Sequence, residues 1–162
     1  MEATEREERF VLACFEDGGG QGFDWRAAGE RMGFDRAEAD ALAKQLADRG
    51  VFHGLSGAGE GVFTAEGRSL ATQVQKEKGK DPRYWTTEQR ALLKAAHAAG
   101  TGNPPFNAAA AATAAGLSRQ AADGVRAQLV QRGIMLDSRQ MRTFTPAGLE
   151  VVRAHFATIG DS

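Results

Sequence analysis

The side chains best suited to recognising another molecule lie in the last third of the chain. Arg119 and Gln120 follow Ser118, and Arg139 and Arg142 stand a short distance further along. An arginine guanidinium or a glutamine amide can make two hydrogen bonds to one planar group, and arginine also pairs with phosphate. These residue types therefore favour recognition through polar contacts.

Residues for catalysis or for metal binding do not gather in the sequence. His53, His97 and His155 fall on separate predicted elements, and their spacing is not that of metal ligands. We find no nucleophile beside a base and no pair of carboxylates that would share a pocket. Cys14 is the single cysteine, so it cannot form an internal disulfide, and we expect it to be buried in a helix. We predict that the protein is not an enzyme and has neither a cofactor nor a metal site.

The elements that position these side chains occur twice along the chain. Residues 23–34 recur as residues 106–117, and the match continues without a gap beyond them. After an insertion of two residues in the first copy, residues 63–67 fall on residues 144–148. A repeat at a fixed offset over this length indicates two copies of one small domain.

The two copies differ in charge. The chain has 162 residues and a net charge of −1, and we predict domains at residues 1–78 and 86–162 with a linker at residues 79–85. Residues 1–75 hold 8 Lys or Arg against 14 Asp or Glu, whereas residues 86–162 hold 8 against 5. Such an asymmetry between halves indicates a division of labour.

Capping residues and glycine stops predict the same order of elements in both copies. The first copy is predicted to contain helices at residues 4–17, 24–32 and 35–49, a hairpin of residues 51–52 and 62–63, and a last helix from residue 64. The second copy is predicted to contain helices from Thr86, Asn107 and Ser118, a hairpin of residues 134–136 and 141–144, and a last helix from Pro146. The predicted fold class is therefore mostly α with short β-hairpins (α+β).

This order of elements resembles the winged-helix superfamily. A further helix that opens with Thr-x-x-Gly follows each hairpin, at Thr64–Gly67 and Thr145–Gly148, and this step makes the chain similar to bacterial transcriptional regulators of the MarR-like type. The resemblance covers both copies, nearly the whole chain, and implies two tandem winged-helix domains. It also departs from the family, because a MarR-like chain has one winged helix flanked by dimerisation helices.

The resemblance implies that the third helix of a copy can enter a DNA major groove while its hairpin loop reaches an adjacent groove or phosphates. Arg and Gln can make paired contacts to guanine and adenine edges, and loop arginines can meet phosphates or a narrow minor groove. In the second copy, the residues expected to bind DNA are Ser118, Arg119, Gln120, Asp123, Arg126, Arg139 and Arg142.

The first copy is less suited to that role. Its hairpin loop, residues 54–61, carries no positive charge, and acidic residues lie on the third helix. Carboxylates placed against phosphates oppose the electrostatic terms that dominate DNA binding. The expected outer face of that helix holds Arg36, Glu38, Asp40, Lys44 and Asp48. We expect this copy to contact protein.

We therefore expect a bacterial transcriptional regulator that binds double-stranded DNA through its second domain. The sequence has no run of eighteen apolar residues and no leader pattern, so we expect a cytoplasmic protein without a membrane association. The net charge of −1 implies weak non-specific attraction to DNA, so tight binding would need a homodimer or another partner. The alternative is a tandem winged-helix scaffold for protein–protein interactions within a larger assembly, which the acidic first domain favours.

Overall fold

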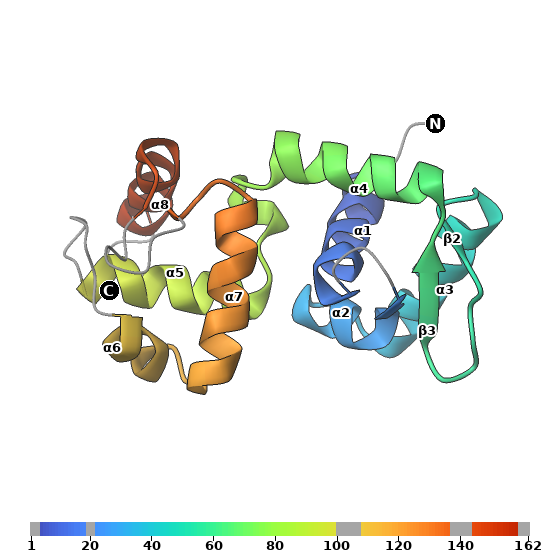
Figure 1. Ribbon diagram of the computed structural model, residues 1–162, viewed down its shortest axis with the longest axis horizontal. Helices are drawn as coiled ribbons and strands as arrows, with labels where there is room; N and C mark the ends of the chain where they lie inside the picture. Colours follow the sequence, from blue (N-terminus) through green and yellow to red (C-terminus); the bar gives the residue numbers. More distant parts are fainter. Residues whose placement is uncertain (1–3, 19–21, 100–107, 137–143, 159–162) are drawn as a thin grey trace. The chain divides into compact units, whose positions relative to one another are not determined.

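The computed structural model is mostly helical with one small antiparallel sheet (Figure 1). It describes residues 4–18, 22–99, 108–136 and 144–158. Over these residues the predicted α+β class is confirmed. The chain divides into two compact units, residues 1–78 and residues 79–162.

The first unit combines four helices with a three-stranded sheet among its described residues. Its elements are α1 (Glu5–Gly18), β1 (Gly22–Asp24), α2 (Trp25–Arg31), α3 (Arg36–Asp48), β2 (Phe52–His53), β3 (Glu60–Phe63) and α4 (Ala65–Lys78). The strand order is β1-β3-β2, with Phe52 opposite Phe63 and Phe23 opposite Gly61. The pair β2 and β3 is the hairpin predicted from the sequence, whereas β1 was not predicted.

Short-range signals explain where the helices of the first unit begin and end. The side chains of Thr4, Asp24 and Asp35 accept hydrogen bonds from backbone N–H groups at the starts of α1, α2 and α3. These groups would otherwise lack a partner, because the first turn of a helix has no preceding carbonyls to bond. Gly33 and Gly50, with φ of 85° and 81°, turn the chain out of α2 and α3 in a conformation that favours glycine.

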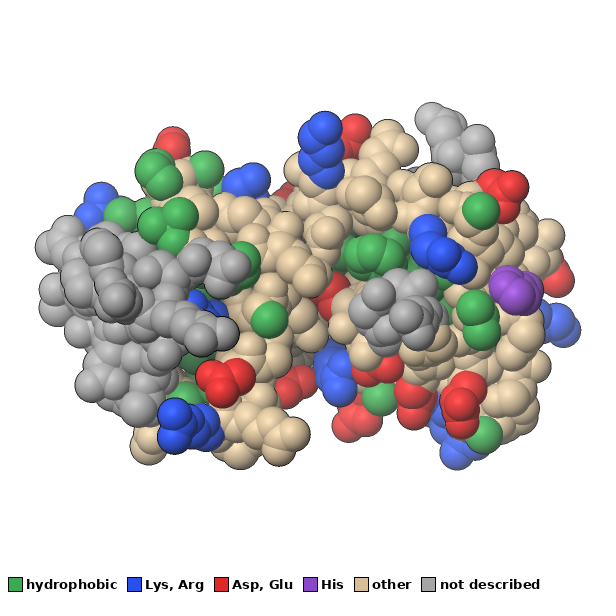
Figure 2. Space-filling view, viewed as in Figure 1, with side chains coloured by type: hydrophobic (Ala, Val, Ile, Leu, Met, Phe, Trp, Pro, Cys, Tyr) green, Lys and Arg blue, Asp and Glu red, His purple; other side chains and the backbone are tan. Residues whose placement is uncertain are grey.

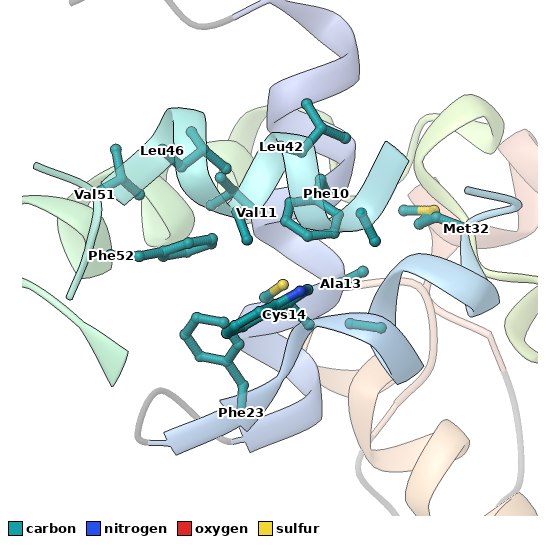
Figure 3. Close-up of a cluster of buried hydrophobic side chains, with 14 of the residues drawn as sticks. Phe10, Val11, Ala13, Cys14, Phe23, Met32, Leu42, Leu46, Val51 and Phe52 are labelled. Atoms are coloured by element: carbon teal, nitrogen blue, oxygen red, sulfur yellow. The ribbon is translucent and has the colours of Figure 1, made fainter. Parts of the chain in front are cut away.

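The core of the first unit is rich in aromatic rings. Phe23, Phe52 and Phe63 lie with ring centroids 4.6–5.1 Å apart, within the range in which aromatic pairs attract each other. Figure 3 shows Phe10 and Cys14 of α1 reaching into the same cluster. Cys14 is fully buried, as expected, and burial raises the pKa of its thiol well above the ordinary value. A thiol that stays protonated is a packing group rather than a nucleophile.

The second unit is helical over its described residues. Its elements are η1 (Pro82–Tyr84), α5 (Thr87–Ala99), α6 (Ala108–Ala114), α7 (Arg119–Gln131) and α8 (Pro146–Thr158). Met135 and Phe144 form an isolated antiparallel bridge at the place of the predicted hairpin. The rest of that hairpin, residues 137–143, lies outside the described residues.

Residues 79–85, which were expected to form a linker, pack within the second unit. Arg132 donates hydrogen bonds to the carbonyl oxygens of Gly79 at 3.3 Å and Tyr84 at 2.8 Å. Tyr84 and Trp85 are buried, and Trp85 belongs to the hydrophobic core of this unit. The segment is therefore the edge of the second unit and not a free connection, because a buried cation and two buried aromatic rings fix it.

The repeat seen in the sequence is also a repeat of the backbone. α2 and α6 begin at Trp25 and Ala108, and α3 and α7 begin at Arg36 and Arg119, so both pairs are offset by 83 positions. The members of each pair have the same length, 7 residues for α2 and α6 and 13 residues for α3 and α7. Residues of α3 can therefore be compared with those of α7 position by position.

The Thr-x-x-Gly step fixes the last helix of the first unit. Thr64 Oγ1 donates to the carbonyl of Gly50 at 2.5 Å and accepts from the N–H of Gly67 at 2.9 Å. A Cβ atom at Gly67 would overlap the carbonyl group of Val51, so only glycine lets α4 lie this close to the chain that follows α3.

The second unit has the same contacts at the start of α8. Thr145 Oγ1 donates to the carbonyl of Gly133 at 2.6 Å and accepts from the N–H of Gly148 at 2.9 Å. A Cβ atom at Gly148 would overlap the backbone of Ile134. The step that suggested a family resemblance is thus a packing device that positions the last helix in both units.

Candidate nucleic-acid interface

The predicted recognition residues of the second unit lie at the start of α7. Ser118 is the N-cap, and its hydroxyl oxygen accepts a hydrogen bond from the N–H of Ala121 at 3.1 Å. Arg119 and Gln120 follow in the first turn, and both are exposed. Within the part of the chain that the structure describes, neither side chain has a hydrogen-bond or ion-pair partner. Ser118 therefore fixes the turn, and two side chains able to make paired hydrogen bonds are available on it.

Asp123 shares a face of α7 with these two residues. It follows Gln120 by three positions and Arg119 by four, which places the three side chains side by side on a helix. Asp123 is exposed, whereas Arg126 is half-buried and its side chain is not free of interactions. The opposite face of α7 is anchored in the core by Ala122, Val125 and Leu129. The anchored face holds the exposed face in a fixed orientation.

The predicted interface extends beyond what the structure describes. Arg139 and Arg142, expected on the hairpin loop, lie outside the described residues. The part of the interface whose geometry is described is therefore the N-terminal half of α7.

Gly124, which was not predicted to belong to the site, is an exposed glycine in the middle of α7. A Cβ atom at this position would meet no atom within 4 Å, so packing within the protein does not require glycine. Glycine inside a helix is less favourable than alanine by about 1 kcal/mol. Ala127, one turn later, is also exposed and small. The backbone of α7 is therefore open to close approach by another surface, and a glycine inside a predicted helix was the sequence signal for it.

The corresponding helix of the first unit, α3, has its central carboxylate engaged. Asp40 accepts hydrogen bonds from Arg26 Nε at 3.0 Å and from Trp25 Nε1 at 2.8 Å. These bonds, that of Arg26 first, hold the pKa of the Asp40 carboxyl below its usual value. Arg26 Nη1 also donates to the carbonyl of Gly57 at 3.2 Å. Asp40 and Arg26 thus tie α2, α3 and the β2–β3 loop together.

Among the described residues of the first unit, exposed carboxylates outnumber exposed Lys and Arg side chains. Glu38 forms an ion pair with Arg6 of α1, and Asp48 is exposed at the end of α3. Figure 2 shows acidic side chains gathered over the first unit near α2 and α3. Arg36 and Lys44 are exposed on α3, so that helix carries cations as well. The mixture is less favourable for phosphates than the surface at the start of α7.

Among the described residues, no group of three or more His, Cys, Asp or Glu side chains could hold a metal ion. No helix in the same part of the chain is long and apolar enough to cross a membrane.

Comparison with protein-family models, curated proteins and solved structures found no match for this chain. The informative comparison is therefore the internal one, between α3 and α7. At equal backbone positions it pairs Arg36 with Arg119, Ala37 with Gln120, Asp40 with Asp123, Ala41 with Gly124 and Lys44 with Ala127. The two helices share their buried face and differ in what they present to solvent.

Proposed function

We propose that the chain is a DNA-binding transcriptional regulator made of two winged-helix domains, and that α7 of the second unit enters the major groove of duplex DNA. The observation that carries this proposal is the first turn of α7, where Arg119 and Gln120 are exposed and without partners in the described part of the chain. Arginine makes paired hydrogen bonds to guanine, and glutamine makes them to adenine, from such a position.

The order of the elements supports the winged-helix assignment. In the first unit, α2 and α3 are separated by a short turn, and the strand pair β2–β3 follows α3 directly. β1, from before α2, completes the sheet on the far side of β3. The second unit repeats the α2–α3 pair as α6 and α7 at the same offset. In helix-turn-helix domains the second helix of this pair is the one that reads DNA.

Charge supports assigning the DNA contact to the second unit. Basic residues outnumber acidic residues in residues 86–162, whereas acidic residues outnumber basic residues in residues 1–75. The start of a helix also favours anions, because its free N–H groups point outward. Arg139 and Arg142 are proposed to add phosphate contacts from the hairpin loop. With a net charge of −1 over the whole chain, affinity must come from these local contacts or from a second copy.

The first unit favours a second function, that of a protein-interaction scaffold within a larger assembly. Its exposed carboxylates oppose a phosphate backbone, and its β2–β3 loop has no basic residue. We propose that this unit contacts a protein partner while the second unit contacts DNA. If the second unit does not bind DNA, the scaffold becomes the function of the whole chain.

Matched variants of the two helices test the assignment. The double variant Arg119→Ala and Gln120→Ala should weaken binding to a labelled duplex by roughly tenfold or more, because base contacts are lost. The double variant Arg36→Ala and Lys44→Ala removes exposed side chains from α3 and should change binding little. Fluorescence anisotropy at one fixed salt concentration measures both. An equal loss of DNA affinity in the two double variants would contradict the assignment of DNA binding to the second unit alone.

A further inference from the structure

The two copies hold an aspartate at the same helical position but give it different surroundings. In the first unit, Asp40 is bonded by Trp25 and Arg26, the first two residues of α2. The corresponding first two residues of α6 are Ala108 and Ala109, whose side chains can donate no hydrogen bond. Asp123 of the second unit therefore lacks the hydrogen-bond donors that Asp40 has in the first.

Asp123 is consequently an unpaired carboxylate on the face proposed to meet DNA. It is exposed, and within the described residues it has neither a hydrogen-bond partner nor an ion-pair partner. A negative charge at this place repels phosphates, so it lowers the affinity for DNA in general. A group that costs affinity for every sequence can still raise the preference for one of them, if it gains a contact there.

The chemistry of a carboxylate limits what that contact can be. An ionised carboxylate only accepts hydrogen bonds. In the major groove, hydrogen-bond donors are the exocyclic amines of cytosine and adenine, and a carboxylate pairs with the N4 amine of cytosine. Adenine also presents its N7 acceptor beside its amine, which repels a carboxylate.

The side chains around Asp123 allow such a short residue to reach a base. An aspartate extends only a little beyond the helix backbone, so the helix must lie close to the floor of the groove. Gly124 and Ala127 leave the backbone of α7 uncovered beside Asp123, whereas Lys44 of α3 stands at the position that Ala127 occupies in α7. The exposed Gly124 is an observation independent of the absence of partners for Asp123 in the described residues. It also indicates that another surface can approach the backbone of α7 closely.

We propose that Asp123 is a specificity-determining residue that accepts a hydrogen bond from the N4 amine of a cytosine in the major groove. The proposal rests on the DNA-binding function proposed above and adds one base to what α7 recognises. Asp123 thereby lowers the affinity for DNA of any sequence and raises the preference for sites that hold this cytosine.

Selection of binding sites by the full-length chain from a pool of randomised duplexes tests this assignment. The wild-type protein should enrich cytosine at one position, with a preference on the order of tenfold over other bases. Asp123→Asn should lose that preference, or shift it to adenine, while the other enriched positions stay the same. The same variant should bind random duplex more tightly than the wild type, because a charge that repels phosphates is gone.

Asp48→Asn is the matched control, since it removes the same charge from an exposed position at the end of α3. It should leave the enriched sequence unchanged. If the wild type and Asp123→Asn enrich the same bases at every position, the assignment of Asp123 is overturned and the DNA-binding function stands. If the wild type binds no duplex, the function and the assignment fall together.

Discussion

Asp40 and Asp123 occupy equivalent helical positions but have different surroundings. Asp40 holds Trp25 and Arg26 against α3 through three hydrogen bonds. Asp123 stands at the same position without those donors, since α6 begins with alanines. The carboxylate is bonded within the first unit, and we propose that in the second unit it is available for recognition.

The structural role of Asp40 predicts a dependence of stability on acid. Its folded pKa lies below the ordinary value of 3.8, so the carboxylate stabilises the folded state above that value and loses this contribution as the pH falls through the lower, folded pKa. Arg26→Ala removes the largest cause of the shift. It should reduce the free energy of unfolding near neutral pH by about 1 kcal/mol, because the ion pair is partly exposed.

Denaturant titrations at neutral pH and at pH near 3 measure this effect. The difference between Arg26→Ala and the wild type should be smaller at the acidic pH, because that pH lies below the ordinary aspartate pKa of 3.8 and the stabilising contribution falls with pH there. Arg68→Ala, an exposed change on α4, serves as the control and should alter stability little. An undiminished difference at low pH would contradict the role assigned to the Asp40 carboxylate.

Among the elements, those defined by local signals could be predicted from the sequence. α2 and α3 begin after Asp24 and Asp35 and end before Gly33 and Gly50, and each of these residues acts within its own turn. β1 was missed because its three residues have one buried side chain and gain their structure by pairing with β3, far along the chain. Strand pairing of this kind depends on the packed structure rather than on local sequence.

In the candidate site, too, local features could be predicted from the sequence and contacts that depend on packing could not. The first turn of α7 was predicted because Ser118 is a good N-cap and its neighbours are polar. The bonds from Trp25 and Arg26 to Asp40 were not predicted, because they depend on how α2 packs on α3. Without them the contrast between Asp40 and Asp123 is invisible in the sequence, where both are simply an aspartate in a helix.

Gly124 allows a test of how closely α7 is approached. Gly124→Ala should stabilise the fold by about 0.5–1 kcal/mol, because alanine favours a helix and its Cβ atom meets nothing within 4 Å. The same change should weaken binding to duplex DNA several-fold, since a methyl group then stands between helix and groove. Thermal unfolding and fluorescence anisotropy give the two readouts. Greater stability with unchanged binding would show that no surface approaches the helix at this residue.

Over the whole molecule, the division into two units could be predicted from the sequence repeat. A repeat at a constant offset implies that both copies have the same elements at the same spacing. The offset of 83 positions holds for α2 and α6 and for α3 and α7, and the Thr-x-x-Gly step recurs with the same hydrogen bonds. What could not be read from the sequence was that Arg132 donates hydrogen bonds to the carbonyl oxygens of Gly79 and Tyr84, since these residues lie far from Arg132 along the chain. The two units therefore share these elements and contacts, while the exposed faces of α3 and α7 differ.

The net charge of the whole chain is only −1, so any affinity for DNA must come from local contacts between basic side chains and phosphates. The salt dependence of DNA binding therefore tests the proposed function most directly. Fluorescence anisotropy of a labelled random duplex, titrated with the full-length protein from low to physiological salt, counts the phosphates that are neutralised on binding. We expect binding at low salt with a log–log salt slope of about −3 or steeper, corresponding to roughly three or more phosphates. Absence of binding even at low salt would contradict the DNA-binding function, and the acidic first unit would then be the place to look for a protein partner.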